Sequence, residues 1–161
     1  EMLRSLVGSE MCIRDRDIPA LDKLLYEVHK VHSDIRPDLF RAGAKKYTDD
    51  ELVKILTDET TPVFVYDDGE IQGYAFTVII DHKNDLSLMP YKSVYIDDLC
   101  VEKDCRGKGV GKKLYEHVLS FAKSINAYNV TLNVWAGNDS ALKFYEKIGL
   151  RVQKTGMEVI L

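Results

Sequence analysis

Cys105-Arg106-Gly107-Lys108-Gly109-Val110-Gly111 lies between an apolar, strand-like run and a long amphipathic helix pattern. Three glycines at alternate positions let the backbone approach a ligand closely. A helix that begins here also points its unpaired N–H groups at an anion. By itself the stretch is as typical of an ordinary strand-to-helix turn as of an anion-binding loop, so its neighbours decide between these two interpretations.

Regular patterns flank this stretch on both sides. Ser93 to Val101 predicts a long strand, and a helix is predicted from Gly109 onward. The apolar residues on one face of that helix are Val110, Leu114, Val118, Phe121 and Ile125. The stretch therefore connects a strand to a helix, and it lacks both the Gly-Lys-Ser/Thr of a Walker loop and the Gly-x-Gly-x-x-Gly of a dinucleotide fold.

Two helices are predicted nearer the N-terminus. Asp17 is a suitable N-cap for the first, which Arg36-Pro37-Asp38 interrupts. Thr48 with Glu51 three positions later has the spacing of a capping box and predicts the start of the second. The intervening Leu39 to Tyr47 is compatible with a short helix or with an active-site loop.

Strands dominate the middle of the chain and return at its end. Pro62 to Tyr66 and Ile71 to Ile80 predict a hairpin joined by a tight turn, and Val130 to Val134 alternates as a strand does. Asn138 or Asp139 caps a further helix that ends near Gly149. Residues 151–154 and 157–161 predict a closing hairpin. The predicted order is β-α-α-β-β-β-α-β-α-β-β, a mixed α/β fold with mostly antiparallel pairing.

The first residues are treated separately. Residues 1–10 carry apolar residues without a clear period and lack the features of a signal peptide, so we interpret them as a non-native or disordered leader. Met11 to Arg14 predicts a short first strand. The predicted domain is thus 11–161.

Length and composition restrict the function. The chain has 161 residues, enough for one domain, and a formal net charge of −4 gives it no general attraction for nucleic acid. No apolar run reaches the length of a membrane span. Cys12, Cys100 and Cys105 are odd in number and lack metal-ligand spacing, so we expect a cytoplasmic protein without a metal.

Two blocks resemble the GNAT family of N-acetyltransferases. Arg106, Gly109 and Gly111 match the family's acetyl-CoA motif, Arg/Gln-x-x-Gly-x-Gly/Ala. Asn138 to Leu150 is similar to its Asn-x-x-Ala-x-x-Phe-Tyr-x-x-x-Gly-Phe element, with leucine at the last position. The resemblance covers roughly Met11 to Leu161 and implies the GNAT fold, in which a splayed central sheet exposes a strand edge.

The resemblance also implies how acetyl-CoA is held. Backbone N–H groups from Arg106 to Gly111 surround the pyrophosphate, and Leu99 to Val101 pairs with the pantetheine arm like an added strand. The N–H of Leu99 or Cys100 stabilises the tetrahedral oxyanion. The complete set of predicted cofactor-binding residues is Leu99, Cys100, Val101, Arg106, Gly107, Lys108, Gly109, Val110, Gly111, Lys112, Asn138 and Tyr145. Lys108 and Lys112 are equally typical of a solvated helix face.

Four residues are candidates for the chemistry. Tyr145 stands where the family places the acid that protonates the leaving thiolate, although a core aromatic is the alternative. Asp97 and Asp98 are adjacent and are expected to project to opposite sides of their strand. At least one of the two is predicted to bind the substrate or to act as the base. The resemblance favours Asp97 as the base. The alternative is that these are ordinary strand aspartates that are solvated or form salt bridges. Cys100 has no nearby histidine to activate it, which favours a structural role over a nucleophilic one.

Other features are weaker. His29 and His32 have no third ligand in the sequence and are predicted to be a surface pair. Trp135 and Tyr128 are interpreted as packing residues. Arg36 to Tyr47 falls where the family forms its acceptor-site wall.

The sequence therefore predicts an N-acetyltransferase that transfers acetyl from acetyl-CoA directly to a primary amine. A pair of acidic residues at this point of the strand resembles the pair found in the polyamine acetyltransferases of the family. A small cationic amine is therefore the first expectation for the acceptor. A protein N-terminus or a lysine is an alternative acceptor, and a non-catalytic acyl-CoA-binding module is an alternative function. A homodimer is compatible with the family.

Overall fold

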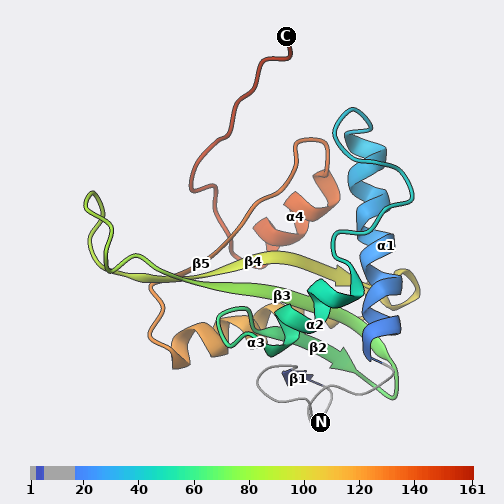
Figure 1. Cartoon of the computed structure of the whole chain (residues 1–161), viewed down its shortest axis with the longest axis horizontal. Coiled ribbons are helices and arrows are strands. Elements are labelled where there is room, and N and C mark those ends of the chain that lie inside the picture. Colours follow the sequence, from blue (N-terminus) through green and yellow to red (C-terminus); the bar gives the residue numbers. More distant parts are fainter. Residues whose placement is uncertain (1–2, 6–16) are drawn as a thin grey trace.

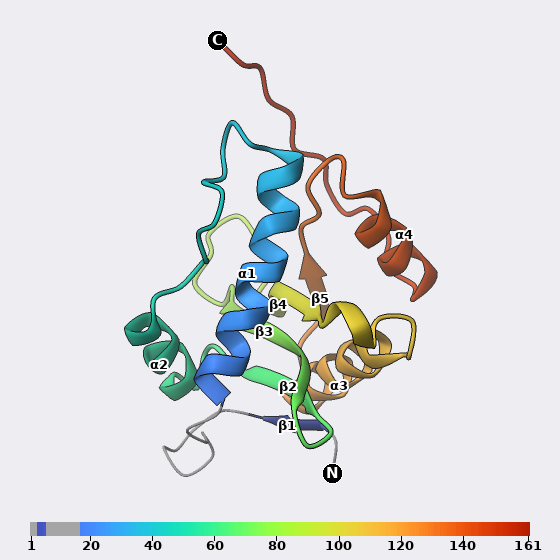
Figure 2. The same cartoon turned by 90° about the vertical axis from the view of Figure 1, so that its right-hand side faces the viewer.

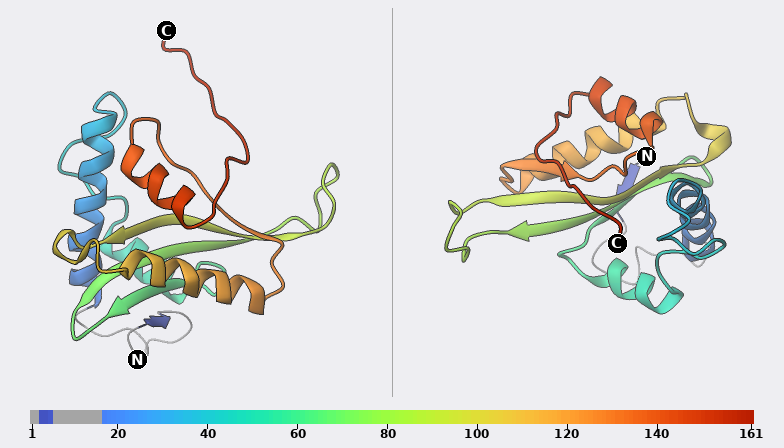
Figure 3. Two further views of the ribbon diagram at one scale, coloured as in Figure 1. Left: turned by 180° about the vertical axis from the view of Figure 1, so that it is seen from behind. Right: turned by 90° about the horizontal axis from the view of Figure 1, so that it is seen from above.

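The computed structural model describes residues 3–5 and 17–161, which form a mixed sheet with helices on both faces (Figures 1 and 3). The strands are β1 (Leu3–Ser5), β2 (Val63–Asp67), β3 (Ile71–Asp81), β4 (Lys92–Val101) and β5 (Asn129–Leu132). The helices are α1 (Asp17–Ile35), α2 (Asp49–Thr57), α3 (Val110–Ser124) and α4 (Asp139–Lys147), with a 3-10 turn at Lys103–Cys105. None of these helices combines the length and the apolar character needed to cross a bilayer.

The strand order in the sheet is β1-β2-β3-β4-β5. Every pair is antiparallel except β4 with β5, which is parallel because α3 connects them across one face. The predicted mixed α/β fold with mostly antiparallel pairing is confirmed. β5 pairs with β4 only from Ser93 to Ile96, so the two strands separate beyond that point.

Two hydrophobic cores hold the layers together. On one face, leucines of α1 and α2 pack against Val63, Val65, Tyr74 and Phe76. On the other, Val110, Leu114 and Val118 of α3 pack against Phe64, Ala75, Val94 and Ile96. Seen from above, α3 and α4 lie on one side of the sheet and α1 and α2 on the other (Figure 3). The alternating strand residues therefore fill both cores.

Local capping signals set the helix ends as predicted. Glu51 N–H donates to Thr48 Oγ1 at 3.2 Å, and Thr48 N–H donates to Glu51 Oε2 at 2.8 Å, which completes the capping box of α2. Asn138 caps α4 by accepting from Ala141 N–H at 3.3 Å. Gly149 follows α4 with a φ of 103°, and Leu150 N–H bonds to Tyr145 O at 3.0 Å, which ends the helix in a left-handed turn.

Two regions differ from the predicted pattern, and in a third the structure decides between two predicted alternatives. The closing hairpin is wrong, because residues 151–161 contain no strand. Leu39 to Tyr47 contains no helix and forms a loop of turns. Leu3–Ser5, inside the segment interpreted as a leader, pairs with β2, whereas the strand predicted at Met11 to Arg14 lies outside the described residues.

Gly73 marks the tightest contact between the sheet and α3. A Cβ at this position would lie 2.8 Å from Cys100 O, 3.1 Å from Leu114 Cδ1 and 3.3 Å from Val110 Cγ1. Because the nearest atom belongs to the backbone of β4, we expect Gly73→Ala to lower the free energy of unfolding by about 1–3 kcal/mol. Urea denaturation measures this loss. Gly156→Ala is the control, because no atom lies within 4 Å of its added Cβ, and equal stability changes in the two variants would contradict the prediction.

Candidate active site

A bulge in β4 shapes the centre of the site. Phe76 of β3 pairs with Asp98 and Thr77 pairs with Ile96, so Asp97 has no partner on β3. An extra residue of this kind bends its strand and redirects the side chains beside it. The predicted arrangement of the two aspartates on opposite sides is therefore wrong. Both meet groups on the face of the sheet that α1 and α2 cover.

Asp97 is held by the loop between α1 and α2. Lys46 Nζ lies 2.7 Å from Asp97 Oδ2, and the Tyr47 hydroxyl donates to the same oxygen. Burial, reinforced by this hydrogen bond, raises the pKa of Tyr47, so the phenol stays protonated as a donor. The Asp97 carboxylate thus has both a cation and a hydrogen bond.

Asp98 has a different environment. It is buried, and it accepts a hydrogen bond of 3.0 Å from the hydroxyl of Tyr74, which is itself buried. Burial raises the pKa of Asp98 to about 6, although Lys46 and the Tyr74 hydrogen bond favour the charged form. A carboxyl with this pKa exchanges a proton near neutral pH, which is the property required of a general base.

The edge of β4 beyond Ile96 is open, because β5 has separated from it there. Glu102 N–H donates to Gln72 O of the neighbouring strand at 2.8 Å, so alternate residues along β4 direct their N–H groups to β3. Cys100 belongs to that set. Leu99 and Val101 therefore direct their N–H groups to the open edge. This geometry accommodates an added extended chain, as expected of the pantetheine arm.

The glycine-rich loop follows directly from this edge. Gly107 and Gly109 have φ values of 77° and 82°, a left-handed conformation that glycine adopts without strain. No side chain caps α3, so the N–H groups of its first turn, from Val110 on, remain available to an anion. Gly111 serves packing as well, because a Cβ there would lie 3.2 Å from Phe144 Cζ of α4. The loop thus has the features that a pyrophosphate requires.

The basic residues of the loop have separate surroundings. Arg106 Nε donates to Val101 O at 3.0 Å, which ties the loop to the end of β4. Lys108 is exposed. Lys112 is also exposed, and its Nζ lies 3.7 Å from Glu116 Oε1 on the same helix. Contact of these lysines with a phosphate remains a prediction.

Tyr145 lies on α4, where its ring packs against that of Phe144 with the centroids 5.1 Å apart. Its phenol is mostly shielded from solvent, and burial, followed by the negative charge of Asp98, raises its pKa. Asn138 sits at the start of the same helix, where its side chain is occupied as the N-cap. Tyr145 therefore remains protonated near neutral pH, the state that a general acid needs.

Cys100 is buried, and its Sγ lies 3.6 Å from Leu24 O of α1. Burial raises the pKa of this thiol to about 12, and the carboxylates of Asp98 and Glu27 act in the same direction. Since the thiolate is the nucleophilic form, this environment is unfavourable for covalent catalysis. The favoured structural role agrees with these surroundings.

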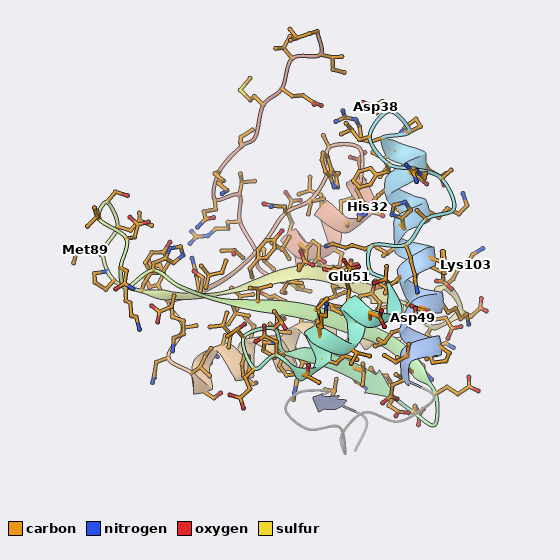
Figure 4. The ribbon with its side chains drawn as sticks, in the orientation of Figure 1. His32, Asp38, Asp49, Glu51, Met89 and Lys103 are labelled. Carbon is orange, nitrogen blue, oxygen red and sulfur yellow. The ribbon has the colours of Figure 1, made fainter. Side chains whose placement is uncertain are left out.

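An aromatic cluster joins α1, the loop after it and the segment after β5. Phe40 packs edge-on against Trp135, with ring centroids 5.4 Å apart, and lies 5.4 Å from His32. Figure 4 shows His32 on α1 and Asp38 in the loop beyond it. The pKa of His32 is lowered by burial and by nearby His29 and Lys46. Phe40, within the segment predicted as the acceptor-site wall, thus contacts Trp135 from the segment after β5, and the role of this segment as a wall remains a prediction.

Glu27 of α1 is a further acidic residue that the sequence pattern does not distinguish from a helix surface residue. Its Oε2 is buried and has no hydrogen-bond partner among residues 3–5 and 17–161. Its charge acts on Cys100, as that of Asp98 does. The sequence pattern does not single out Tyr74 either, because an aromatic residue within an apolar strand is normally a core residue.

Known proteins provide independent comparisons. The chain is 32% identical over 77 residues to the peptidyl-lysine N-acetyltransferase YjaB of Salmonella typhimurium, covering 48% of this chain and 50% of that protein. It is 30% identical over 106 residues to glucosamine 6-phosphate N-acetyltransferase of Arabidopsis thaliana, covering 66% and 62%. The chain thus spans about half of the first relative and less than two thirds of the second.

Structural comparison covers the whole chain. The crystal structure of a tetramutant of the BH1408 protein from Bacillus halodurans superposes with a TM-score of 0.90 at 27% identity, covering 100% of both chains. Residues 25–150 match the acetyltransferase (GNAT) family. This match includes the bulge of β4, the glycine-rich loop and α4. The chain therefore belongs to the acetyltransferase (GNAT) family.

Proposed function

We propose that the chain acetylates a primary amine of a small cationic molecule, which attacks acetyl-CoA directly in a ternary complex. The observation that supports the proposal most strongly is that the acidic side chains around the bulge of β4 outnumber the basic side chains paired with them. Lys46 is paired with Asp97, whereas no ion pair joins Asp98 or Glu27 to a basic side chain within the described ranges. A buried carboxylate without a counter-ion favours binding of a cation.

The donor half of the proposal assigns acetyl-CoA to the loop and the open edge. The N–H groups of the first turn of α3 would hold the pyrophosphate, with Arg106 keeping the loop against β4. Leu99 and Val101 would pair with the pantetheine arm. Of the two candidate oxyanion donors, the N–H direction favours Leu99, because that of Cys100 faces β3.

The chemistry requires a base, and we assign this role to Asp98 instead of Asp97. Asp97 is already engaged with Lys46 and Tyr47, whereas the pKa of Asp98 suits proton exchange at neutral pH. The amine loses a proton to Asp98 and forms the new bond from its nitrogen to the acetyl carbon. The carbon–sulfur bond breaks, and Tyr145 donates its proton to the departing sulfur.

A cytoplasmic setting is part of the same proposal. It is supported by the free thiols of Cys100 and Cys105, which suit a reducing compartment.

An acceptor panel tests this proposal. The purified chain is assayed by release of free thiol from acetyl-CoA with spermine, a lysine-containing peptide and glucosamine 6-phosphate. We expect the highest kcat/KM with the polyamine, because its cationic groups compensate Asp98 and Glu27. Glu27→Gln, which keeps the shape but removes the charge, should raise KM for the polyamine about tenfold or more. The KM for acetyl-CoA should not change.

Other outcomes identify the alternatives. The highest kcat/KM with the peptide would assign the chain to lysine acetylation. A preference for glucosamine 6-phosphate would contradict a cationic acceptor. CoA binding without turnover on any acceptor would indicate a binding module.

A further inference from the structure

Lys46 places a primary amine of the chain itself against the acidic side chains at the bulge of β4. Its Nζ lies 2.7 Å from Asp97 Oδ2 and 3.4 Å from the backbone oxygen of the same residue. Its charge also acts on Asp98, where burial raises the pKa of the carboxyl and Lys46 opposes that rise. No other lysine or arginine among residues 3–5 and 17–161 forms an ion pair with either aspartate. The site therefore holds a built-in amine of the kind that an acceptor supplies.

The loop that carries Lys46 leaves this side chain accessible. The loop runs from the end of α1 back alongside that helix to α2 (Figure 2), and residues 39–47 form turns without a helix. The Lys46 side chain is 40% exposed, and ion pairs of this exposure hold their partners weakly. The ammonium can therefore leave Asp97 and return to it.

Lys45, the preceding residue, has the opposite surroundings. Its Nζ lies 2.7 Å from Asp22 Oδ1 and 2.5 Å from Asp49 Oδ1, and its side chain is only 17% exposed. The hydrogen bonds to these two carboxylates raise the pKa of Lys45, so its nitrogen keeps the proton that a nucleophile must lose. Lys45 thus fastens the loop to α1 and α2, whereas Lys46 faces the acidic side chains of β4.

Reach and direction also favour Lys46. Leu99, whose N–H faces the open edge of β4, is two residues beyond Asp97, about 7 Å along a strand. Asp98, the base proposed above, stands between them and meets groups on the same face of the sheet as Asp97. An acetyl group held at the Leu99 N–H would therefore be reached by rotation of the Lys46 side chain, with the base beside its path.

We infer that the enzyme acetylates its own Lys46 from acetyl-CoA, within one chain, while no external acceptor occupies the site. The inference rests on the proposed function, because it uses the same donor, base and acid. Asp98 takes a proton from the Lys46 ammonium, and the nitrogen forms a bond to the acetyl carbon. The carbon–sulfur bond breaks, the sulfur receives the proton of Tyr145, and a second proton from the nitrogen restores the phenol. The products are acetyl-lysine and the free thiol of CoA, with one proton released to solvent.

The modification changes the charge of the site. Acetylation removes the positive charge of Lys46. Asp97 then keeps the hydrogen bond of Tyr47 but loses its counter-ion, and Asp98 loses a cation that favours its charged form. A chain that has met acetyl-CoA without an acceptor therefore carries one positive charge fewer at the bulge of β4.

Mass spectrometry of the purified protein tests the inference. After incubation with acetyl-CoA and no acceptor, fragmentation of the peptide that contains both loop lysines should place an acetyl group on Lys46 rather than on Lys45. Labelling of Lys83, an exposed lysine of the β3–β4 loop, measures spontaneous acetylation and should be at least about tenfold slower. The rate at Lys46 should not depend on protein concentration, as a reaction within one chain requires.

Variants show whether the active site performs this chemistry. Asp98→Asn and Tyr145→Phe should each slow the labelling of Lys46 by about 10²-fold or more. Asp85→Asn in the exposed β3–β4 loop and Tyr115→Phe on α3 are the matched controls, which should be labelled at the rate of the unmodified protein. Circular dichroism confirms that each variant is folded. The acceptor with the highest kcat/KM, supplied far above its KM, should protect Lys46 by about tenfold or more, because both amines need the same carboxylates.

Two kinds of result would overturn the inference through the label itself. Equal labelling of Lys46 and Lys83, or labelling of Lys46 that survives both active-site variants, would assign the acetyl group to spontaneous chemistry. A rate proportional to protein concentration would place the reaction between chains.

The acceptor panel separates this inference from the proposed function. Turnover of an added amine without any label on Lys46 would overturn the inference and leave the proposed function intact. A label on Lys46 that depends on Asp98 and Tyr145, without turnover of any small cationic amine, would support the inference and contradict the proposed class of acceptor.

Discussion

Asp98→Asn is expected to lower kcat/KM by about 10²–10⁴-fold, the usual range for loss of a general base. The amide keeps the size of the carboxyl and can accept the hydrogen bond of Tyr74, but it cannot take a proton from the amine. For the unmodified enzyme, kcat/KM should rise with pH through about 6, where Asp98 becomes charged. The variant should lose this rise. Thiol release between pH 5 and pH 9 measures both effects.

The same substitution should have the opposite effect on stability. The pKa of Asp98 is higher in the folded chain than its ordinary value of 3.8, so the folded state favours the protonated form. Its stabilising contribution is complete below pH about 4 and is lost as the pH rises through about 6. At pH 8 the buried charge is a cost that the amide avoids. Asp98→Asn should therefore raise the melting temperature at pH 8, and the gain should disappear at pH 4.

Asp97→Asn tests which of the two aspartates acts as the base. It removes the counter-ion of Lys46, whereas the amide oxygen can still accept the hydrogen bond of Tyr47, so we expect a smaller loss of kcat/KM and an unchanged rise with pH near 6. A larger loss than that of Asp98→Asn would return the role of base to Asp97. Asp85→Asn, in the exposed β3–β4 loop, should leave the activity unchanged and controls for general effects of removing a carboxylate.

Local signals made much of the fold predictable. The capping box at Thr48 and the glycine after α4 specify helix ends through residues three or four positions apart, and both were placed correctly. The glycine-rich stretch was recognisable for the same reason, because the turn and the helix start are encoded in one short segment. Such features depend little on the rest of the chain.

The details that distinguish the two aspartates depend on distant residues. The bulge at Asp97 arises from how β4 registers with Phe76 and Thr77 of β3, some twenty residues earlier. Strand alternation alone predicts that the side chains of Asp97 and Asp98 lie on opposite faces of the sheet. The environment of Asp98 likewise depends on Tyr74, and the burial of Glu27 Oε2 depends on how α1 packs. These contacts do not exist until the sheet and α1 have assembled.

The wrong prediction of a closing hairpin rests on strand alternation alone. Alternation shows that a segment can be a strand, but a strand also needs a neighbour with free backbone groups. Residues 151–161 have the pattern without the neighbour in their own chain.

Tyr145→Phe should lower kcat by about 10²–10⁴-fold, because the departing thiolate then lacks its proton donor. The phenyl ring still packs against Phe144, whose centroid lies 5.1 Å away, so the fold and the KM for acetyl-CoA should change little. Tyr115→Phe is the matched control. It removes the same atom from a tyrosine buried on α3, and its activity should equal that of the unmodified enzyme.

The leaving group provides the decisive comparison. An acetyl donor whose thiol is more acidic than that of CoA needs less help from an acid, because its thiolate departs readily without a proton. Tyr145→Phe should therefore lose much less activity with such a donor than with acetyl-CoA. A purely structural role of Tyr145 predicts equal losses with both donors. Because burial, Asp98 and Cys100 keep the phenol protonated, no decline in rate attributable to Tyr145 is expected as the pH rises toward 9, and only the donor comparison isolates its proton.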